Sequence, residues 1–323
     1  MANELRKAIN NVSITGVVKE VKDLKENKGD NGKYINGSLV VKAGSSEITV
    51  KVFVQQMTKT GNEKKAYTNL KKFIDGEFNS MATDSENPAR IKIYGNGDFT
   101  PQLKEDIYVP KGKTKATSSI NVDLGFGNVI VDNDITEEEF GATFDIEMFV
   151  KDVIEEVKKV GDDEEETGRV IVKGLVPCYN GTVFPLNIVT GIIPPEEAGE
   201  EEYDFASDVR DGISQGGTIN IWGNINYERI VEKKKKGGSL GKAKIEDKTT
   251  YIHELVGTGA EVLEDEDKQF DEDLIAKAVK ERNNTIKEEE AKAQSEDGEN
   301  KGKGLKTSGS KEEGRKPKKS LGF

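Results

Sequence analysis

The residues best placed to do chemistry are basic and aromatic side chains that alternate with apolar ones along two short segments. The first segment holds Lys51 and Phe53, and the second holds Arg90, Lys92 and Tyr94. Alternate residues of an extended chain point to the same side, so each segment would present its charged and aromatic groups together. Lysine and arginine attract phosphates, and an aromatic ring stacks on a nucleic-acid base with about 1–3 kcal/mol per stack. The pattern predicts a surface that holds a single-stranded nucleic acid.

Residues that could carry catalysis are scarce. The chain has one cysteine, Cys178, and one histidine, His253, so it cannot build a zinc site from Cys and His ligands or an internal disulfide. A phosphate-binding GxxxxGKS or GxxxxGKT loop is absent, and no helix pattern follows the glycines of 124–128, which favours a turn there. The acidic runs at 161–168 and 264–267 are typical of solvated charge. We predict no enzyme activity, no catalytic or metal-binding residue and no cofactor; a metal-dependent nuclease that uses carboxylates is the enzymatic alternative.

The net charge of -12 is unevenly distributed along the chain. Residues 1–135 carry 20 Lys+Arg and 17 Asp+Glu, residues 136–290 carry 19 and 38, and residues 291–323 carry 9 and 5. The first part is slightly basic and the middle part is strongly acidic. A nucleic acid is therefore expected to meet the first part more readily than the middle part.

The elements that must position these groups are short strands. In the first part, alternation of apolar and polar residues predicts strands at 12–18, 34–42, 47–54, 90–94 and 119–124, with a helix at 63–78 between the third and fourth. A glycine inside the first strand indicates a bulge or a bend. This order is that of the OB-fold, a five-stranded Greek-key barrel that binds its ligand on the second and third strands.

The same order recurs in the acidic part. Strands are predicted at 144–157, 169–176, 182–190, 218–227 and 250–256, with a weaker helix pattern at 203–213. The fourth strands echo one another, since RIKIYGNGDF and TINIWGNINY both pass from a large aromatic residue to a Gly-Asn pair. We therefore expect a mostly β chain of two tandem OB-like five-stranded barrels, residues 1–135 and 136–263, each with a helix between its third and fourth strands. A duplicated β-barrel without a ligand is the alternative.

The polar segments between the strands are expected to be loops, at 22–33, 101–118, 161–168 and 228–249. After the second barrel, the acidic segment 264–293 contains a helix pattern from 271 onward, which either packs on a barrel or stays solvated. From 294 to 323 Gly, Ser, Lys and Glu dominate, so we expect a disordered tail.

The nucleic-acid-binding residues expected in the first barrel are its outward basic and aromatic side chains and the lysines of the loop before its fifth strand: Tyr34, Lys42, Lys51, Phe53, Arg90, Lys92, Tyr94, Lys111, Lys113 and Lys115. The second barrel repeats this set in part, with Arg169, Lys173, Trp222, Tyr227 and Arg229. Its acidic segment at 161–168 would repel phosphate, and Trp222 is open between an interior position and a base-stacking one. The first barrel is therefore the principal candidate.

Three segments carry a family resemblance: INNVSITGVV at 9–18, NGKYINGSLVV at 31–41 and ITVKVFV at 48–54 resemble the first three strands of bacterial and phage single-stranded-DNA-binding proteins. The tandem arrangement, with IYGN or IWGN in each half, resembles a replication or recombination protein of a Gram-positive bacteriophage. The resemblance implies sequence-tolerant binding of single-stranded DNA and recruitment of replication or recombination proteins through the C-terminal region. Bacterial relatives end in an acidic peptide with a terminal Phe, whereas Phe323 follows the basic KPKKSLG.

The N-terminus has no apolar region typical of a signal peptide, and no run approaches the ~18 apolar residues of a membrane span. We expect no membrane partner and a cytoplasmic location, which is the host cytoplasm for a phage-encoded chain. The acidic middle part supports a second hypothesis, a tandem β-barrel that serves as a structural or protein-interaction component of a phage assembly.

Overall fold

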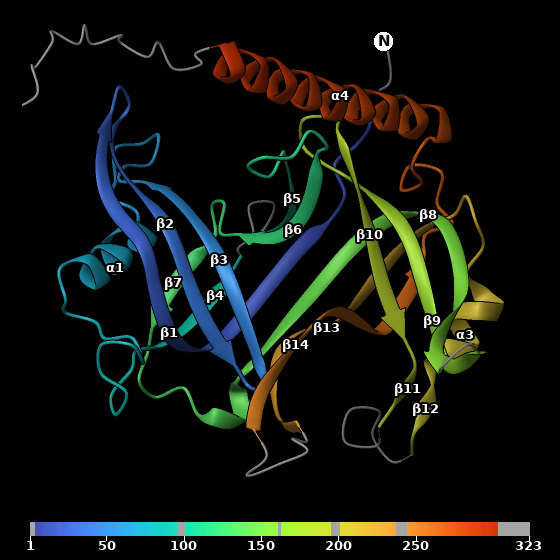
Figure 1. The fold of residues 1–323 in the computed structure, drawn as a ribbon, viewed down its shortest axis with the longest axis horizontal. Helices are drawn as coiled ribbons and strands as arrows, with labels where there is room; N and C mark the ends of the chain where they lie inside the picture. The colour runs from blue at the N-terminus through green and yellow to red at the C-terminus, as the bar shows by residue number, and fades with distance from the viewer. Residues whose placement is uncertain (1–3, 96–100, 161–162, 195–200, 237–243, 303–323) are drawn as a thin grey trace, which may run out of the picture.

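Most of the chain forms β-strands of one large mixed sheet, with a long helix at its C-terminal end (Figure 1). The computed structural model describes residues 4–95, 101–160, 163–194, 201–236 and 244–302. The strands fall into a first half and a second half, which are connected by the short 3-10 helix Glu137–Glu139.

The elements of the first half are β1 (Asn10–Gly29), β2 (Gly32–Ala43), β3 (Ser46–Gln55), α1 (Lys65–Ile74), β4 (Arg90–Tyr94), β5 (Gln102–Tyr108), β6 (Thr117–Asp123) and β7 (Asn128–Val131). Strand β1 pairs antiparallel with β2 and with β4, and β2 pairs antiparallel with β3. Strand β3 pairs parallel with β6, and β4 pairs antiparallel with β7. Strand β5 forms a hairpin with β6 at the edge of the sheet.

The elements of the second half are β8 (Gly141–Val160), β9 (Asp163–Pro177), β10 (Val183–Thr190), β11 (Ile192–Ile193), β12 (Tyr203–Asp204), α3 (Phe205–Gly212), β13 (Thr218–Lys236) and β14 (Lys244–Val262). Strand β8 pairs antiparallel with β9 and β13, β9 pairs antiparallel with β10, and β10 pairs parallel with β14. Apart from the small β11–β12 pair, this pairing order repeats that of the first half.

The two halves are joined by hydrogen bonds between strands and by the last helix. Strand β1 pairs antiparallel with β8 from Asn10↔Ile146 to Thr15↔Gly141, so the sheet runs through both halves. Helix α4 (Glu272–Gly302) lies across both halves in Figure 1. Its Ile275 and Ala278 are buried in the common core, which confirms that the helix packs on the sheet.

Apolar alternation fixes which side of each strand faces the core. On β3 the even-numbered apolar residues Ile48, Val50, Val52 and Val54 are buried, whereas Phe53 points outward. Two glycines, one on β1 and one on β13, allow close approach of the backbones. A Cβ on Gly16 would collide with the carbonyl oxygen of Lys42, and a Cβ on Gly223 would collide with that of Val256.

The strand predictions at the core are confirmed, but the four predicted loops are wrong in part, because each contains strand residues. Segment 22–33 lies in the β1–β2 hairpin, residues 163–168 belong to β9, and 101–118 contains β5 and the start of β6. Residues 228–236 continue β13 and 244–249 begin β14, whereas 161–162 and 237–243 lie outside the described residues. The outer parts of the β8–β9 and β13–β14 hairpins are exposed on both faces, and in 22–33 and 101–118 only Leu24, Pro101 and Leu103 are buried. The apolar alternation that marks a half-buried strand is therefore missing or too short in all four segments.

Three further boundaries differ from the prediction. The predicted fifth strand of the first half is two strands, β6 and β7, separated by a turn at 124–127. Helix α1 is shorter than 63–78 because Gly76, with φ of 77°, turns the chain after it. The predicted disorder from 294 is wrong as far as Gly302, where α4 ends, and the rest of that segment lies outside the described residues.

Within the described residues, no helix combines the length and the apolar composition that crossing a membrane requires.

Candidate nucleic-acid interface

The outward side of β2 and β3 carries a pair of aromatic rings, Tyr34 and Phe53. We call the surface that these rings form with Lys51 the β2–β3 face. The centroids of the Tyr34 and Phe53 rings are 5.1 Å apart with a tilt of 38°. Phe53 opposes Asn36 and Tyr34 opposes Gln55, so the two aromatics are diagonal cross-strand neighbours. The Phe53 side chain is 56% exposed, although burial of a ring of this size is normally favourable. The face therefore offers an aromatic platform to a ligand.

The neighbouring β5–β6 hairpin supplies charge at the rim of this face. The Lys51 ammonium forms an ion pair with Asp106, and Asn121 donates a hydrogen bond of 2.6 Å to the same carboxylate. Lys104 lies 3.4 Å from Asp123 on the same hairpin. Exposed ion pairs of this kind contribute about 0–1 kcal/mol, so exchanging such a carboxylate for a phosphate costs little.

Two exposed aromatic residues beside this face were missed by the sequence analysis. Phe126 is 67% exposed in the turn between β6 and β7, and the Lys64 ammonium lies 5.1 Å from the centre of its ring. The turn is held against β3 because the Leu124 amide donates to the Lys51 carbonyl at 2.8 Å. Tyr108, which is 48% exposed, follows Asp106 on the same side of β5. An aromatic residue between two glycines was the available signal for Phe126.

The predicted loop lysines lie at the end of the β5–β6 hairpin. Lys111, Lys113 and Lys115 are all exposed there. The next residue, Ala116, donates its amide to the Glu290 carboxylate of α4 at 3.1 Å. The loop can therefore contact a phosphate backbone, and its base is held by the C-terminal helix.

The structure does not bring the second predicted segment onto the β2–β3 face. Strand β4 pairs with β1 and β7, so Arg90, Lys92 and Tyr94 lie on another side of the first half. The Arg90 guanidinium donates to the Ile135 carbonyl and lies 5.7 Å from the Phe140 ring centre. This correction follows from the strand order, which alternation within single strands does not reveal.

Other members of the predicted set lie near that second segment. Lys92 lies 6.0 Å from the Tyr94 ring centre, and Tyr94 lines a hollow with Ser13 and Asp145. Lys42 lines a different hollow, which it shares with Arg90. The ten residues predicted in the first half therefore occupy more than one surface.

Arg169 in the second half is already neutralised. Its guanidinium donates to Glu156 at 2.6 and 2.7 Å and to Glu254 at 3.0 and 3.1 Å. The hydrogen bonds that the guanidinium donates to Glu156, followed by those to Glu254, raise its pKa. A phosphate would have to displace two carboxylates, so this geometry favours a structural role for Arg169.

The remaining predicted residues of the second half lie on β9 and β13. Lys173 is half-buried, opposite Asp152 and Asn187. Trp222 is 41% exposed, and its indole packs on Gly259, where a Cβ would approach the ring to 2.5 Å. One face of Trp222 is thus used for packing and the other remains accessible. Tyr227 stacks on His253 with ring centroids 4.8 Å apart, and Arg229 follows on the exposed part of β13.

Comparison with known proteins places this chain in a family. The sequence model of the YorF family matches residues 8–292. The chain belongs to the YorF family. The match includes both halves of the sheet and most of α4, so the whole arrangement described above is the YorF-family region of the chain. No curated protein sequence matches the chain.

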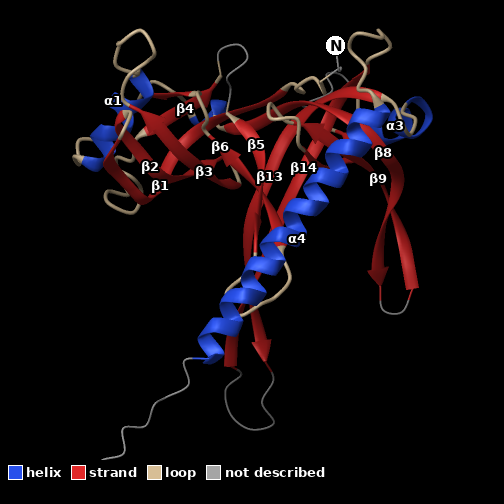
Figure 2. Cartoon of the chain, turned by 90° about the horizontal axis from the view of Figure 1, so that it is seen from above, coloured by secondary structure: helices blue, strands red, loops and turns tan. Residues whose placement is uncertain are grey.

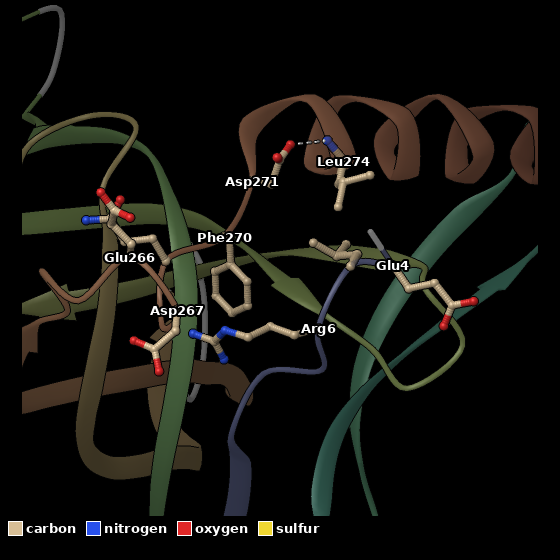
Figure 3. A pocket seen from close by; sticks show the side chains of 9 residues that line it. Glu4, Arg6, Glu266, Asp267, Phe270, Asp271 and Leu274 are labelled. Carbon is tan, nitrogen blue, oxygen red and sulfur yellow. Dashed lines mark hydrogen bonds between the residues drawn. The ribbon is translucent and has the colours of Figure 1, made fainter. Parts of the chain in front are cut away.

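The hollow in Figure 3 lies where the N-terminal segment of this YorF-family chain meets the residues at the start of α4. The Arg6 guanidinium lies 4.1 Å from the Phe270 ring centre and forms an ion pair of 2.6 Å with the buried Glu147. The other lining residues include four carboxylates, from Glu4, Glu266, Asp267 and Asp271. An acidic hollow whose arginine is already paired is unsuited to an anion, so we assign it a structural role.

A half-buried contact near the turn of the β1–β2 hairpin joins this hairpin to α1. The Tyr67 hydroxyl donates to Glu26 at 2.8 Å, and the Lys33 ammonium lies 2.7 Å from the same carboxylate. Hydrogen bonds from Lys33 and then Tyr67 lower the pKa of Glu26 to about 2. Desolvation, reinforced by Glu26, raises the pKa of Tyr67 to about 12.

Among the described residues, no cluster of His, Cys, Asp and Glu has the geometry of a metal site.

Proposed function

We propose that this YorF-family chain binds single-stranded DNA with little sequence preference, without catalysing a reaction, and that it acts in phage DNA replication or recombination in the host cytoplasm. The observation that carries the proposal is the contact of the exposed Phe53 ring with the half-buried Tyr34 ring, beside Lys51. Aromatic platforms next to basic groups bind single strands because every base offers a π-face and every nucleotide a phosphate.

The proposal includes an OB-like barrel in each half. It is supported by the repeated pairing order, in which the first strand pairs with the second and fourth and the third pairs parallel with the fifth. In that fold the second and third strands and the loop between the fourth and fifth strands grip the ligand. The β2–β3 face and the β5–β6 hairpin occupy these places in the first half.

The test is binding of fluorescent oligo-dT to chains altered on this face. Phe53→Ala and Tyr34→Ala each remove one stacking ring, so each is expected to weaken binding by about 5- to 100-fold. Tyr94→Ala, which changes an aromatic residue on another side of the first half, is expected to weaken binding less. Tyr179→Ala is the matched control, because Tyr179 is exposed on the β9–β10 turn. Full affinity in both the Phe53 and Tyr34 variants would contradict the proposal.

A second function is favoured by one observation, the excess of acidic residues in the second half. Residues 136–290 hold 38 Asp+Glu against 19 Lys+Arg, and such a surface suits a protein partner better than DNA. The chain would then be a structural or interaction component of a phage assembly. Its purification with other phage proteins and without nucleic acid would support this alternative.

A further inference from the structure

Strands β13 and β14 continue as a two-stranded ribbon that projects from the second half (Figure 2). Strand β13 pairs with β8 only from Thr218 to Asn224, and β14 pairs with β10 only at Val256 and Gly257. Beyond these points β13 and β14 pair with each other as far as Lys236↔Lys244. An isolated two-stranded ribbon is marginally stable in water, so its retention calls for a function outside the core.

The base of this ribbon is attached to the first half. The Ser46 hydroxyl donates to the Ile225 carbonyl at 3.0 Å and accepts from the Tyr227 amide at 3.2 Å. Ser45 also donates to Glu228 at 2.7 Å. Ser45 lies in the turn between β2 and β3, and Ser46 is the first residue of β3; these two strands carry Tyr34 and Phe53. The ribbon therefore starts where the β2–β3 face ends.

One side of the ribbon combines aromatic and basic side chains, and we call it the ribbon face. Tyr227 opposes His253 and Arg229 opposes Tyr251, so all four side chains lie on the same side. The His253 ring is stacked on Tyr227 and lies 6.4 Å from Tyr251 in an edge-to-face contact. Tyr251 is 62% exposed, and Arg229 and His253 are exposed as well.

The ribbon is also a basic element within an acidic half. Residues 228–250 contain eight Lys+Arg and four Asp+Glu, whereas acidic residues predominate twofold in 136–290 as a whole. A polyanion is attracted to such a basic segment and repelled by the surface around it. Charge and exposed rings thus indicate the same class of ligand.

We propose that the ribbon face, formed by Tyr227, Arg229, Tyr251 and His253, is a second contact for the single strand held by the β2–β3 face. The single strand of DNA would pass from Phe53 along β3, over Ser46 and Ser45, and onto the ribbon. Ser46 precedes Phe53 by seven positions along the extended strand, a distance of about 23 Å. A short oligonucleotide then reaches only one contact, whereas a long one reaches both. This inference rests on the function proposed above.

The test compares oligo-dT of about 8 and about 30 nucleotides, lengths chosen from the roughly 4–16 nucleotides that one OB barrel covers. In the double variant Arg229→Ala/Tyr251→Ala, binding of the long oligomer is expected to weaken by about 10- to 100-fold, because a stacking ring and a phosphate contact are lost. Binding of the short oligomer is expected to stay within about twofold of the parent. Ile230→Ala is the matched control, since Ile230 is exposed on the opposite side of the ribbon.

Each other outcome has a defined meaning. If the double variant binds both lengths like the parent while Phe53→Ala weakens both, the ribbon contact is refuted and the proposed function stands. If the double variant binds the short and the long oligo-dT equally weakly and its circular dichroism spectrum is unchanged, the ribbon face is not a second contact that only long strands reach. The proposed order of the two contacts is then refuted. A blunt duplex of equal length is the third arm: if the double variant loses duplex binding but not long oligo-dT binding, the ribbon contacts duplex DNA and the inference fails. If the parent binds none of the three, both proposals fail.

Discussion

The two halves share a pairing order but differ in one hairpin, which is β5–β6 in the first half and β13–β14 in the second. In the first half the short β5–β6 hairpin lies against β3 through Lys51 and Asp106, and α4 covers it. In the second half the long β13–β14 hairpin projects as a two-stranded ribbon, attached at its base to the β2–β3 turn. The same topology therefore yields a compact rim in one half and an extended arm in the other.

The strands that the halves have in common differ in the same way. The outward side of β3 carries Lys51 and Phe53, whereas the exposed positions of β10 are Pro185 and Asn187. On β9, the outward Arg169 is engaged by two carboxylates. Equivalent strands thus hold different side chains, which teaches that function follows from residues placed on a fold and not from strand order.

The largest expected effect concerns how α4 holds the β5–β6 hairpin. Arg282 and Glu105 form a bidentate ion pair at 2.5 and 2.7 Å, and their side chains are 17% and 6% exposed. Arg282→Ala would leave the Glu105 carboxylate buried without its partner, so we expect a loss of about 3 kcal/mol in the free energy of unfolding. Urea unfolding measures this loss.

Two comparisons sharpen that measurement. Lys280→Ala, at an exposed position on the same helix, is the control and should leave stability within about 0.5 kcal/mol. Adding Glu105→Gln to Arg282→Ala removes the buried charge and should recover part of the loss. An Arg282→Ala chain as stable as the parent would mean that α4 does not hold the hairpin.

A smaller effect is expected from the lysine loop. Replacing Lys111, Lys113 and Lys115 by Ala should reduce the slope of log affinity against log salt by about 2, since each phosphate contact on a single strand contributes about 0.7. The control replaces three exposed lysines on β8 of the acidic half by Ala: Lys151, Lys158 and Lys159. Equal changes in slope for both triple variants would mean that lysines of the first half contact phosphates no more than lysines of the second half do.

The smallest effect concerns the pH dependence of the β1–β2 hairpin. Because the pKa of Glu26 falls from 4.5 to about 2 in the folded chain, its stabilising contribution is complete above pH 4.5 and is lost as the pH falls toward 2. The stability difference between the parent and Glu26→Gln should therefore shrink over this window. A difference that stays constant from pH 4.5 to 2 would contradict the assignment of the low pKa to Glu26.

The sequence predicted those parts of the fold in which one face of an element is buried. The alternation of Ile48, Val50, Val52 and Val54 identified β3 and its inward side, and both prove correct. The base of the β13–β14 ribbon was predicted as strands, whereas its outer part was predicted as a loop because solvent reaches both faces there. The Arg282–Glu105 pair was invisible because its residues lie 177 positions apart.

The part of the candidate site that lies on a single strand was predicted correctly, whereas the part that depends on how strands pair was not. Lys51 and Phe53 share a strand, so alternation alone placed them together. Arg90 was assigned to the same surface although β4 pairs with β1, a choice that depends on tertiary pairing. Phe126 was overlooked because a single aromatic residue in a turn has no periodic signal.

Titration of the full chain with fluorescent oligo-dT and with duplex DNA at several salt concentrations tests the central claim most directly. We predict that the chain binds the single strand in preference to the duplex. We also predict that its affinity for oligo-dT falls steeply as salt rises, because phosphate contacts release counterions. Weak binding that does not respond to salt, or equal affinity for duplex and single strand, would contradict the account.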